Sequence, residues 1–254
     1  MCGILAIFGS TKGEHSLSQE ARAASAKMRH RGPDWCGTKV MGQNAIAHER
    51  LAIVDPESGE QPLFSEDGAI GVVVNGEIYN HLTLKAGMLK GAYFSTGSDC
   101  EVIIPLYQKL GSTPEAAAQL CQHLDGVFAF VLYDAEADIY VAGRDPIGVN
   151  PLYMGWSKDG AVYFASELKA MHTTTGFDGC QRIVEFPPGA VYTSRMDEPK
   201  VWYKPAWHDN AYLPTGALDF AELRQEVRAC AAGRYSRRKA DTFVRAARSS
   251  RRRW

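Results

Sequence analysis

The sequence has no long apolar run, no excess of charge of one sign and no secretory leader. No segment approaches the roughly 18–20 consecutive apolar residues of a membrane-spanning helix. The formal net charge of −1 gives no electrostatic reason for the whole chain to bind nucleic acid or an acidic membrane. The N-terminus lacks the basic stretch, apolar stretch and cleavage site of a signal peptide. These absences predict a cytoplasmic protein whose partners include neither a membrane nor a nucleic acid.

The cysteines are scattered and form no metal-binding motif. No two stand in a Cys-x-x-Cys pair, and none has the Cys/His spacing of a zinc site. We therefore expect no metal, and reduced thiols of the kind that the cytosol maintains. The six are Cys2, Cys36, Cys100, Cys121, Cys180 and Cys230. Only Cys2 has a position that predicts reactivity.

The 254 residues are 45% hydrophobic and 22% charged, so the chain can bury a sizeable core. Apolar runs bounded by turn residues predict roughly eight strands, and helical spacing predicts two or three helices. Ser16 and Gln19 fit a capping box at the start of the first helix. These elements indicate an α+β domain. The clearest strands are 4–8, 45–48, 71–74, 127–133, 139–143, 161–165 and 190–193, and the clearest helices 16–28 and about 101–110.

Cys2 lies at the head of the first predicted strand and is a candidate nucleophile. If an aminopeptidase removes Met1, the α-amino group of Cys2 stands beside its own sulfur. An α-amino group titrates near ~8, so it is less protonated than a lysine at neutral pH and can accept the thiol proton. The alternative is that Cys2 is a small buried hydrophobe.

Three further polar positions each allow two interpretations. Arg50 leads into an apolar run, and a buried arginine either pairs internally or binds a ligand carboxylate. Asn75-Gly76 after β-branched residues is typical of a hairpin turn, but the Asn75 amide and the Gly76 N–H can also form a donor pair for an oxyanion. Asp99 either caps a helix or binds a ligand ammonium.

Nine segments, in their order and spacing, resemble the glutaminase domain of glutamine-dependent asparagine synthetase. Each motif is weak alone, and their agreement from residue 1 to about residue 230 makes the resemblance specific. Their wording favours this family over the phosphoribosyl- and sugar-phosphate amidotransferases that share the fold. The segments are MCGI (1–4), HRGPD (30–34), HERLAIVD (48–55), QPL (61–63), VNGEIYNH (74–81), TGSDCE (96–101), GRD (143–145), SELK (166–169) and FPPG (186–189).

The resemblance implies a class II glutamine amidotransferase with the fold of the N-terminal-nucleophile hydrolases. That fold is an α+β, four-layer αββα sandwich, in which two antiparallel sheets lie between helical layers. It also implies hydrolysis of L-glutamine to L-glutamate and ammonia, without a cofactor, through a γ-glutamyl thioester on Cys2. In the full-length family the ammonia serves the synthesis of asparagine from aspartate and ATP. The alternative is a catalytically weak module that binds glutamine or a partner protein.

The resemblance assigns the chemistry of the expected site to three residues. Cys2 would be the nucleophile that attacks the side-chain amide of glutamine. Its α-amino group would take the thiol proton and later pass one to the departing ammonia. Asn75 and Gly76 would form the oxyanion hole.

The resemblance also assigns the residues that would bind glutamine. Arg50 would hold the α-carboxylate and Asp99 the α-ammonium, with Glu77 beside Asp99. Arg31 would be a neighbouring group and not a direct ligand. The remaining lining would come from Leu51, Ala52, Ile53 and Val54.

The resemblance predicts a glutaminase domain over residues 1–210 and a truncated start of a synthetase domain over 211–254. In the family that second domain uses ATP and Mg, and its Ser-Gly-Gly-Leu-Asp-Ser loop cradles pyrophosphate; we expect no such site here. Residues 224–254 hold ten arginines, which predicts either a disordered tail or a shifted reading frame. The expected partners are therefore glutamine and either a separate synthetase domain or a second copy of the chain.

Overall fold

The computed structural model describes residues 1–172, 178–205 and 224–225. The chain divides into two compact units, Met1–Tyr203 and Lys204–Trp254. All the helices and strands named below belong to the first unit. The predicted domain boundary after residue 210 and nearly all of the arginine-rich stretch lie outside the described residues, so both stay predictions.

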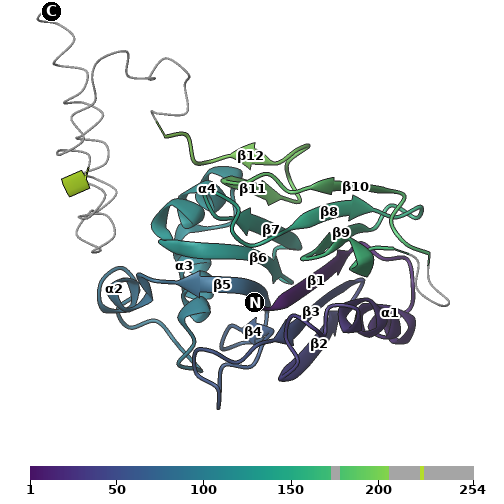
Figure 1. Cartoon of the computed structure of the whole chain (residues 1–254), viewed down its shortest axis with the longest axis horizontal. Coiled ribbons are helices and arrows are strands. Elements are labelled where there is room, and N and C mark those ends of the chain that lie inside the picture. Colours follow the sequence, from purple (N-terminus) through teal and green to yellow (C-terminus); the bar gives the residue numbers. More distant parts are fainter. Residues whose placement is uncertain (173–177, 206–223, 226–254) are drawn as a thin grey trace, which may run out of the picture. The chain divides into compact units, whose positions relative to one another are not determined.

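Two six-stranded antiparallel sheets make up the described fold (Figure 1). The strands of the first sheet are β1 (Gly3–Phe8), β2 (Trp35–Met41), β3 (Asn44–Arg50), β8 (Tyr153–Trp156), β9 (Val162–Ala165) and β10 (Arg182–Glu185). Those of the second are β4 (Leu63–Phe64), β5 (Ile70–Ile78), β6 (Gly126–Asp134), β7 (Ile139–Arg144), β11 (Ala190–Thr193) and β12 (Lys200–Val201). Their orders are β10-β8-β9-β1-β3-β2 and β12-β11-β7-β6-β5-β4.

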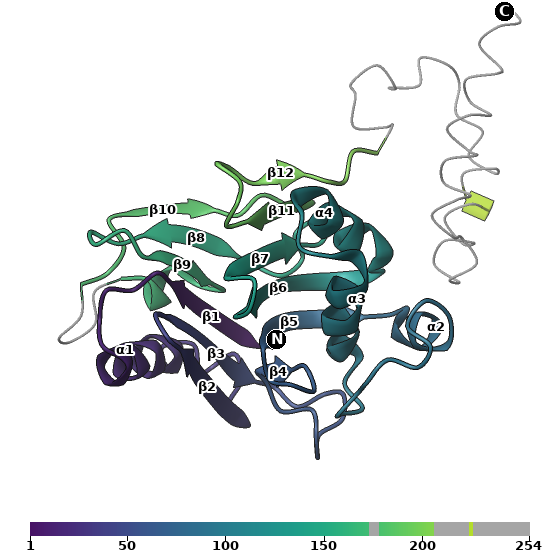
Figure 2. The same ribbon diagram turned by 180° about the vertical axis from the view of Figure 1, so that it is seen from behind.

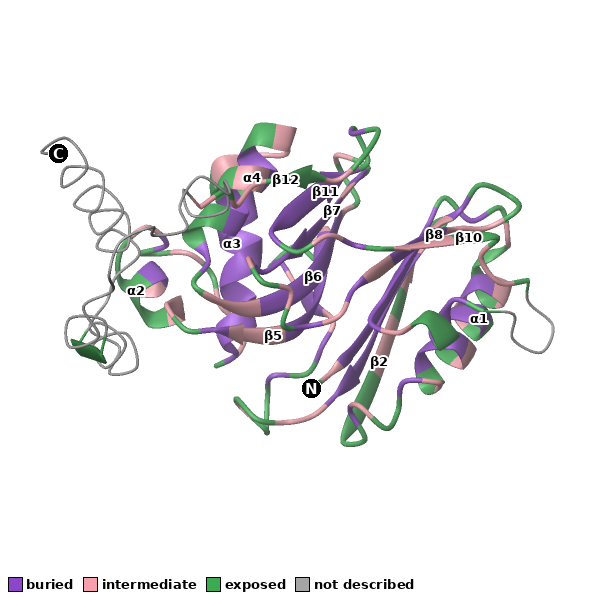
Figure 3. Cartoon of the chain, turned by 45° about the horizontal axis from the view of Figure 1, so that its top comes forward, coloured by how far each residue is buried: buried purple, intermediate pink, exposed green. Residues whose placement is uncertain are grey.

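Helices cover the outer face of each sheet. The helices are α1 (Glu14–Ala26), α2 (His81–Ala86), α3 (Ile103–Leu110) and α4 (Pro114–His123), with short 3-10 turns η1 (Asp99–Val102) and η2 (Leu168–Ala170). Helix α1 packs on β1 and β3, whereas α3 and α4 pack on the second sheet (Figures 2 and 3). The layer order α1, first sheet, second sheet, α3 with α4 confirms the predicted αββα sandwich.

The alternation of side chains along β1 explains why this strand lies between two layers. Ile4, Ala6 and Phe8 belong to the large core shared with the second sheet. Leu5 and Ile7 belong to a separate core beneath α1. Because successive side chains of a strand point to opposite faces, an unbroken apolar run is buried on both sides. The run therefore holds the residue before it, Cys2, at the end of a central strand.

The described residues form twelve strands and four α-helices, more than the roughly eight strands and two or three helices predicted, and the predicted capping box is wrong. Helix α1 begins at Glu14 after Gly13, with no side-chain cap, so Ser16 lies inside the helix and makes no capping box. Of the two interpretations of Asn75-Gly76, the structure excludes the hairpin turn, because β5 continues through both residues to Ile78. Residues 70–78 pair in register with β6 as far as Gly126. This long pairing outweighs the local turn preference of the dipeptide.

Candidate active site

Cys2 is held by contacts from three segments. Its backbone N–H donates to the Asn75 side-chain oxygen (2.9 Å), and its carbonyl accepts from Nε of Arg31 (2.8 Å). The thiol contacts both backbone groups of Leu51: the Leu51 N–H donates to Sγ (3.4 Å), and Sγ donates to the Leu51 carbonyl (3.7 Å). The sulfur therefore has a fixed place at the end of β1.

Burial raises the pKa of the Cys2 thiol above its ordinary value. The hydrogen bond from Leu51 and the positive charges of the N-terminus, Arg50 and Arg31 oppose this effect but do not cancel it. A thiol with a raised pKa is protonated at neutral pH, and only the thiolate is a good nucleophile. Chemistry at Cys2 thus requires a base next to the sulfur.

Asn75 carries an unpaired donor in the interior. Its side chain is 1% exposed, its Oδ1 accepts from Cys2, and its Nδ2 has no partner among the described residues. Buried side-chain donors are nearly always hydrogen bonded, because an unmade bond costs free energy. The free Nδ2 therefore marks a position where a bound molecule would supply an acceptor.

The backbone of Gly76 provides a second donor beside it. In an antiparallel strand, alternate residues direct their N–H and C=O groups to the same edge. The N–H groups of Val74 and Ile78 are bonded by side chains at the β4 edge of β5, so the Gly76 N–H faces that edge between them. A Cβ at position 76 would lie 2.2 Å from the Val127 oxygen, which explains the glycine.

The Arg50 guanidinium is buried against backbone carbonyls. It donates to the oxygens of Val54 (3.1 Å), Asp55 (2.5 Å) and Pro56 (3.3 Å), and the residue is 5% exposed. These partners orient the guanidinium without neutralising it, because they are neutral. The arginine is thus held internally and still offers its positive charge to an anion.

Asp99 is buried and is not the cap of its helix. The cap of η1 is Ser98, whose hydroxyl accepts from the Cys100 N–H (3.3 Å). The Asp99 carboxylate instead accepts from the N–H of Ile78 (2.6 Å) and lies 3.6 Å from the Cys100 sulfur. The carboxylate is therefore fixed beside the end of β5, where an anionic group can meet a ligand cation.

A cavity of about 220 Å³ brings these residues together. Of the predicted site residues, those that line it are Cys2, Arg50, Leu51, Ile53, Val54, Asn75, Gly76, Glu77 and Asp99. Ala52 is not among the lining residues, and its N–H donates to the Asp34 carboxylate (2.9 Å). One cavity thus combines a thiol, a guanidinium, two carboxylates and two directed N–H donors.

The lining also includes residues that the sequence did not single out. They are Met1, Gly59, Gln61, Val74, Ser98, Cys100, Val127, Val149 and Asn150. Val149 and Asn150 are placed by the GRD motif, since Asp145 accepts from the Val149 N–H (3.2 Å) and Arg144 donates to the Asn150 carbonyl (2.8 Å). In the sequence, only the matching segment at 143–145 pointed to this part of the cavity. That segment contains the supporting residues Arg144 and Asp145, whereas the lining residues Val149 and Asn150 follow it.

The HRGPD segment supports the nucleophile. Arg31, which contacts the Cys2 carbonyl, is also paired with Glu167 (3.1 Å). Gly32 packs so closely that a Cβ there would lie 2.2 Å from the Glu49 oxygen. The Asp34 N–H donates to the Arg50 carbonyl (3.0 Å). These contacts place Arg31 next to the cavity residues without making it a lining residue, as expected.

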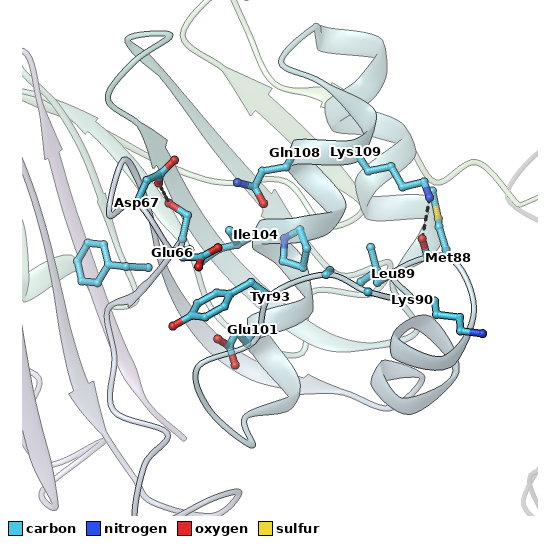
Figure 4. A pocket seen from close by; sticks show the side chains of 15 residues that line it. Glu66, Asp67, Met88, Leu89, Lys90, Tyr93, Glu101, Ile104, Gln108 and Lys109 are labelled. Carbon is cyan, nitrogen blue, oxygen red and sulfur yellow. Dashed lines mark hydrogen bonds between the residues drawn. The ribbon is translucent and has the colours of Figure 1, made fainter.

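A second, larger hollow of about 670 Å³ lies elsewhere, among residues 64–67, the 88–93 loop and α3 (Figure 4). No predicted site residue lines it. Its buried carboxylate, Glu101, already accepts from the backbone and hydroxyl groups of Ser95 and Thr96. Its size therefore does not make it a rival to the cavity at Cys2, where the chemically useful groups converge.

The described residues contain no cluster of three or more His, Cys, Asp or Glu placed to hold a metal ion. In the same part of the chain, no helix is long and apolar enough to cross a membrane. Five cysteines are described and all are free thiols, whereas Cys230 lies outside the described residues.

Comparison with known proteins identifies the family of this domain. The family described as "Glutamine amidotransferase domain" matches residues 1–190. The chain belongs to the class II glutamine amidotransferases. The amidotransferase domain thus covers β1 through the beginning of β11 and contains every predicted site residue.

Relatives of this amidotransferase domain include longer proteins. It is 48% identical over 231 residues to "Asparagine synthetase [glutamine-hydrolyzing]" of Zea mays, covering 89% of this chain and 37% of that protein. It is 46% identical over 232 residues to "Probable asparagine synthetase [glutamine-hydrolyzing]" of Schizosaccharomyces pombe, covering 90% of this chain and 40% of that protein. The chain therefore spans well under half the length of these relatives.

Solved structures confirm the type of fold. The "allosteric regulatory enzyme of purine biosynthesis" matches with a TM-score of 0.66 at 23% identity, over 80% of this chain and 50% of the other. The glutamine phosphoribosylpyrophosphate amidotransferase of B. subtilis matches with a TM-score of 0.63 at 24% identity, over 78% of this chain and 48% of the other. At such identity the likeness is one of fold, and it confirms the predicted sandwich of two antiparallel sheets between helical layers.

Proposed function

We propose that this chain hydrolyses L-glutamine to L-glutamate and ammonia through a γ-glutamyl thioester on Cys2. The observation that supports this most is the unpaired, buried Nδ2 of Asn75, whose Oδ1 accepts from the backbone of Cys2. A donor without an acceptor beside a fixed thiol is the arrangement that stabilises an oxyanion. Membership of the amidotransferase family supports glutamine as the substrate.

An aminopeptidase would first remove Met1 during maturation, which leaves the α-amino group of Cys2 beside the thiol. Burial raises the pKa of the thiol, so the thiol is protonated and needs a base. The α-amino group lies beside the sulfur and takes this proton. The sulfur then attacks the amide carbon of glutamine and forms a carbon–sulfur bond. The carbonyl oxygen becomes an oxyanion that accepts from Asn75 Nδ2 and the Gly76 N–H.

Collapse of this intermediate breaks the carbon–nitrogen bond and releases ammonia. The α-ammonium of Cys2 returns its proton to the leaving nitrogen, so ammonia and the thioester are the products of this step. A water molecule then attacks the thioester carbon, with the same amine as base and the same two donors for the oxyanion. Breaking the carbon–sulfur bond gives glutamate and restores the thiol.

The two charged ends of the amino acid would determine recognition. Arg50 would pair with the α-carboxylate of glutamine. Asp99 would pair with the α-ammonium, and Glu77 would lie beside Asp99. All three residues line the cavity. Leu51, Ile53 and Val54 would pack along the substrate from the same loop. A site that pairs both charges rejects a ligand that lacks one, because the other buried group is left without a partner.

We further propose that the ammonia serves asparagine synthesis. This rests on the relatives, which are called glutamine-hydrolysing asparagine synthetases and extend well beyond the matched region. The acceptor would be a synthetase domain beyond the matched region, whether in the same protein or on a separate chain. ATP and Mg would belong to that domain, and no step on the described residues uses them. The cytoplasmic location stays a prediction.

A glutaminase assay on the purified, N-terminally processed chain tests the first proposal. We expect glutamate release that is abolished by Cys2→Ala and by retention of Met1. Asn75→Ala should lower kcat by roughly 10²–10³-fold, the usual effect of losing one oxyanion donor. Asn80→Ala is the matched control, because the Asn80 amide bonds only near α2 and α4, to the His123 carbonyl and the Asp125 N–H.

Two outcomes would contradict the proposal. Glutamate release that survives Cys2→Ala would exclude the thioester mechanism. Glutamine that is bound in a calorimetric titration but never consumed by the processed wild-type chain would favour the binding module instead.

A further inference from the structure

Strand β5 extends beyond β4, its neighbour at one edge. The two-residue strand β4 pairs only Leu63 with Val72 and Phe64 with Gly71. Strand β5 nevertheless continues to Ile78, and its other edge stays paired with β6 throughout. The backbone groups of positions 74, 76 and 78 therefore face an edge with no strand opposite. Buried backbone groups need partners, so something else must supply them.

Side chains take the place of the missing strand at Val74. The Oε1 of Gln61 accepts from the Val74 N–H (2.7 Å), and Nε2 of His48 contacts the Val74 carbonyl (3.0 Å). His48 is completely buried and Gln61 is 8% exposed. Both backbone groups of the residue immediately before Asn75 are thus fixed at the edge of β5 where β4 has ended.

The same edge is completed beyond Gly76. The Cys100 thiol donates to the Gly76 carbonyl (3.7 Å), and Asp99 accepts from the Ile78 N–H (2.6 Å). Of the three N–H groups at this edge, those of Val74 and Ile78 have side-chain acceptors. In the described part of the chain no acceptor occupies the Gly76 N–H, which is the donor left for a ligand.

The protonation of His48 follows from its surroundings. A carbonyl accepts but cannot donate, so Nε2 carries the hydrogen in this contact. Its Nδ1 is buried without a partner among the described residues. Burial lowers the pKa of His48 to about 4, so the ring is neutral at physiological pH. His48 is therefore a fixed neutral donor to Val74 and no proton carrier.

We propose that His48 and Gln61 are positioning residues of the glutaminase reaction. By holding Val74 they keep β5 extended through Asn75 and Gly76, so that Asn75 Nδ2 and the Gly76 N–H point to the same oxyanion. Neither residue needs to touch the reacting atoms. This inference rests on the proposed glutaminase function.

The role predicts a particular kinetic signature. Oxyanion donors bind the transition state more strongly than the substrate, so disturbing them lowers kcat and leaves KM nearly unchanged. The Cys2 thiol is held independently by Leu51. Its alkylation by iodoacetamide, which forms no oxyanion, should keep its rate.

The test compares loss variants with a conservative one in the full, processed chain. Gln61→Met and His48→Leu remove the acceptor and the donor at similar volume. Each should lower kcat by about tenfold, less than loss of a direct donor costs. His48→Gln, which keeps an N–H donor, should retain most of the activity.

Glutamate γ-semialdehyde provides a readout specific to the oxyanion. Addition of the Cys2 S–H across its carbonyl forms a carbon–sulfur bond and gives a tetrahedral hemithioacetal. The inhibition constant of glutamate γ-semialdehyde should rise in the loss variants by the same factor as kcat/KM for glutamine falls. Tyr163→Phe is the stability control, because it removes a buried hydrogen bond to Glu20 on the α1 side of the first sheet (2.8 Å).

The outcomes separate this inference from the function on which it rests. If the wild type hydrolyses glutamine and the loss variants keep its kcat, the positioning role is wrong. A fall in kcat with an unchanged semialdehyde constant would also exclude it. A wild type without glutaminase activity would overturn the proposed function and this inference with it. Gln61→Met, at the less buried of the two positions, decides the matter if His48→Leu does not fold.

Discussion

At the scale of single residues, the candidate site depends on polar groups that the fold buries and holds without neutralising. The Asn75 amide nitrogen has no partner in the described part of the chain, and the Arg50 guanidinium donates to the carbonyl oxygens of Val54, Asp55 and Pro56. Leaving such groups incompletely paired costs stability. A ligand that completes their bonds recovers this cost, which is why such a site binds an amino acid with both charges in place.

His48 links one residue to the pH dependence of stability. The folded chain keeps His48 neutral down to a pKa of about 4, because burial opposes its charge, whereas an unfolded chain protonates it below about 6.5. Between these values the unfolded state binds more protons, so the free energy of unfolding falls as the pH falls from about 6.5 towards 4. The total is on the order of 3 kcal/mol.

Denaturant unfolding of the wild type and His48→Gln at pH 7 and pH 4.5 measures this contribution. Carboxylates titrate in both proteins, so the difference between the two slopes isolates His48. We expect the variant to lose less stability on acidification. Equal losses in the two proteins would show that His48 is not held neutral by the fold.

At the scale of elements, the site forms where loops from both sheets meet the ends of central strands. The loop after α1 contributes Arg31, the loop after β3 the thiol contacts of Leu51, and η1 the carboxylate of Asp99. Loop ends are joined to one another, as where Gly97 donates to the Asp55 carboxylate (2.8 Å). Rigid strands and mutually bonded loops together preorganise the cavity.

The SELK segment after β9 provides a test at this scale. Glu167 pairs with Arg31 (3.1 Å), Lys169 (2.9 Å) and His30 (3.0 Å), and Arg31 holds the Cys2 carbonyl. Glu167→Gln should weaken the hold on Arg31 and lower kcat about fivefold, which corresponds to about 1 kcal/mol for a partly exposed ion pair. Initial rates of glutamate release measure it.

Lys12→Gln is the control for this change. Lys12 also pairs with a carboxylate, that of Glu20 on α1 (2.7 Å), and neither residue lines the cavity. If both variants lost activity equally, the effect would come from general loosening and not from Arg31.

At the scale of the whole molecule, the described residues of the candidate site all belong to one unit. All the cavity residues and both hydrophobic cores belong to Met1–Tyr203. A domain with its own core and site folds and binds without its neighbour. The proposed use of the ammonia is what would require a further domain.

A chain ended after residue 205 tests this independence. We expect it to keep the thermal melting temperature of the full chain within a few degrees and its rate of glutamine hydrolysis within about twofold, because no described contact of the site lies beyond that point. Differential scanning calorimetry and the glutaminase assay measure both. A truncated chain that fails to fold would show that Lys204–Trp254 contributes to the core.

The residues by themselves predicted an α+β domain, and the resemblance to a known family predicted its four layers. Apolar runs such as residues 4–8 predicted strands, because such runs are typical of strands buried on both faces. Motif order then predicted Cys2, Arg50, Asn75 and Asp99 as one site. The fold prediction is confirmed, because apolar periodicity is a local property that the chain carries in one dimension. The roles of the site residues stay predictions, although the structure brings these residues into one cavity.

Only the tertiary structure decided how these residues meet. The Asn-Gly pair predicts a turn by itself, and pairing with the distant strand β6 makes it straight. The supports of the Val74 backbone, Gln61 and His48, come from segments 13 and 26 residues away in sequence. Such contacts depend on where two sheets stack and where a short strand ends. No local sequence pattern predicts where the sheets stack or where β4 ends, because both follow from the packing of the whole domain.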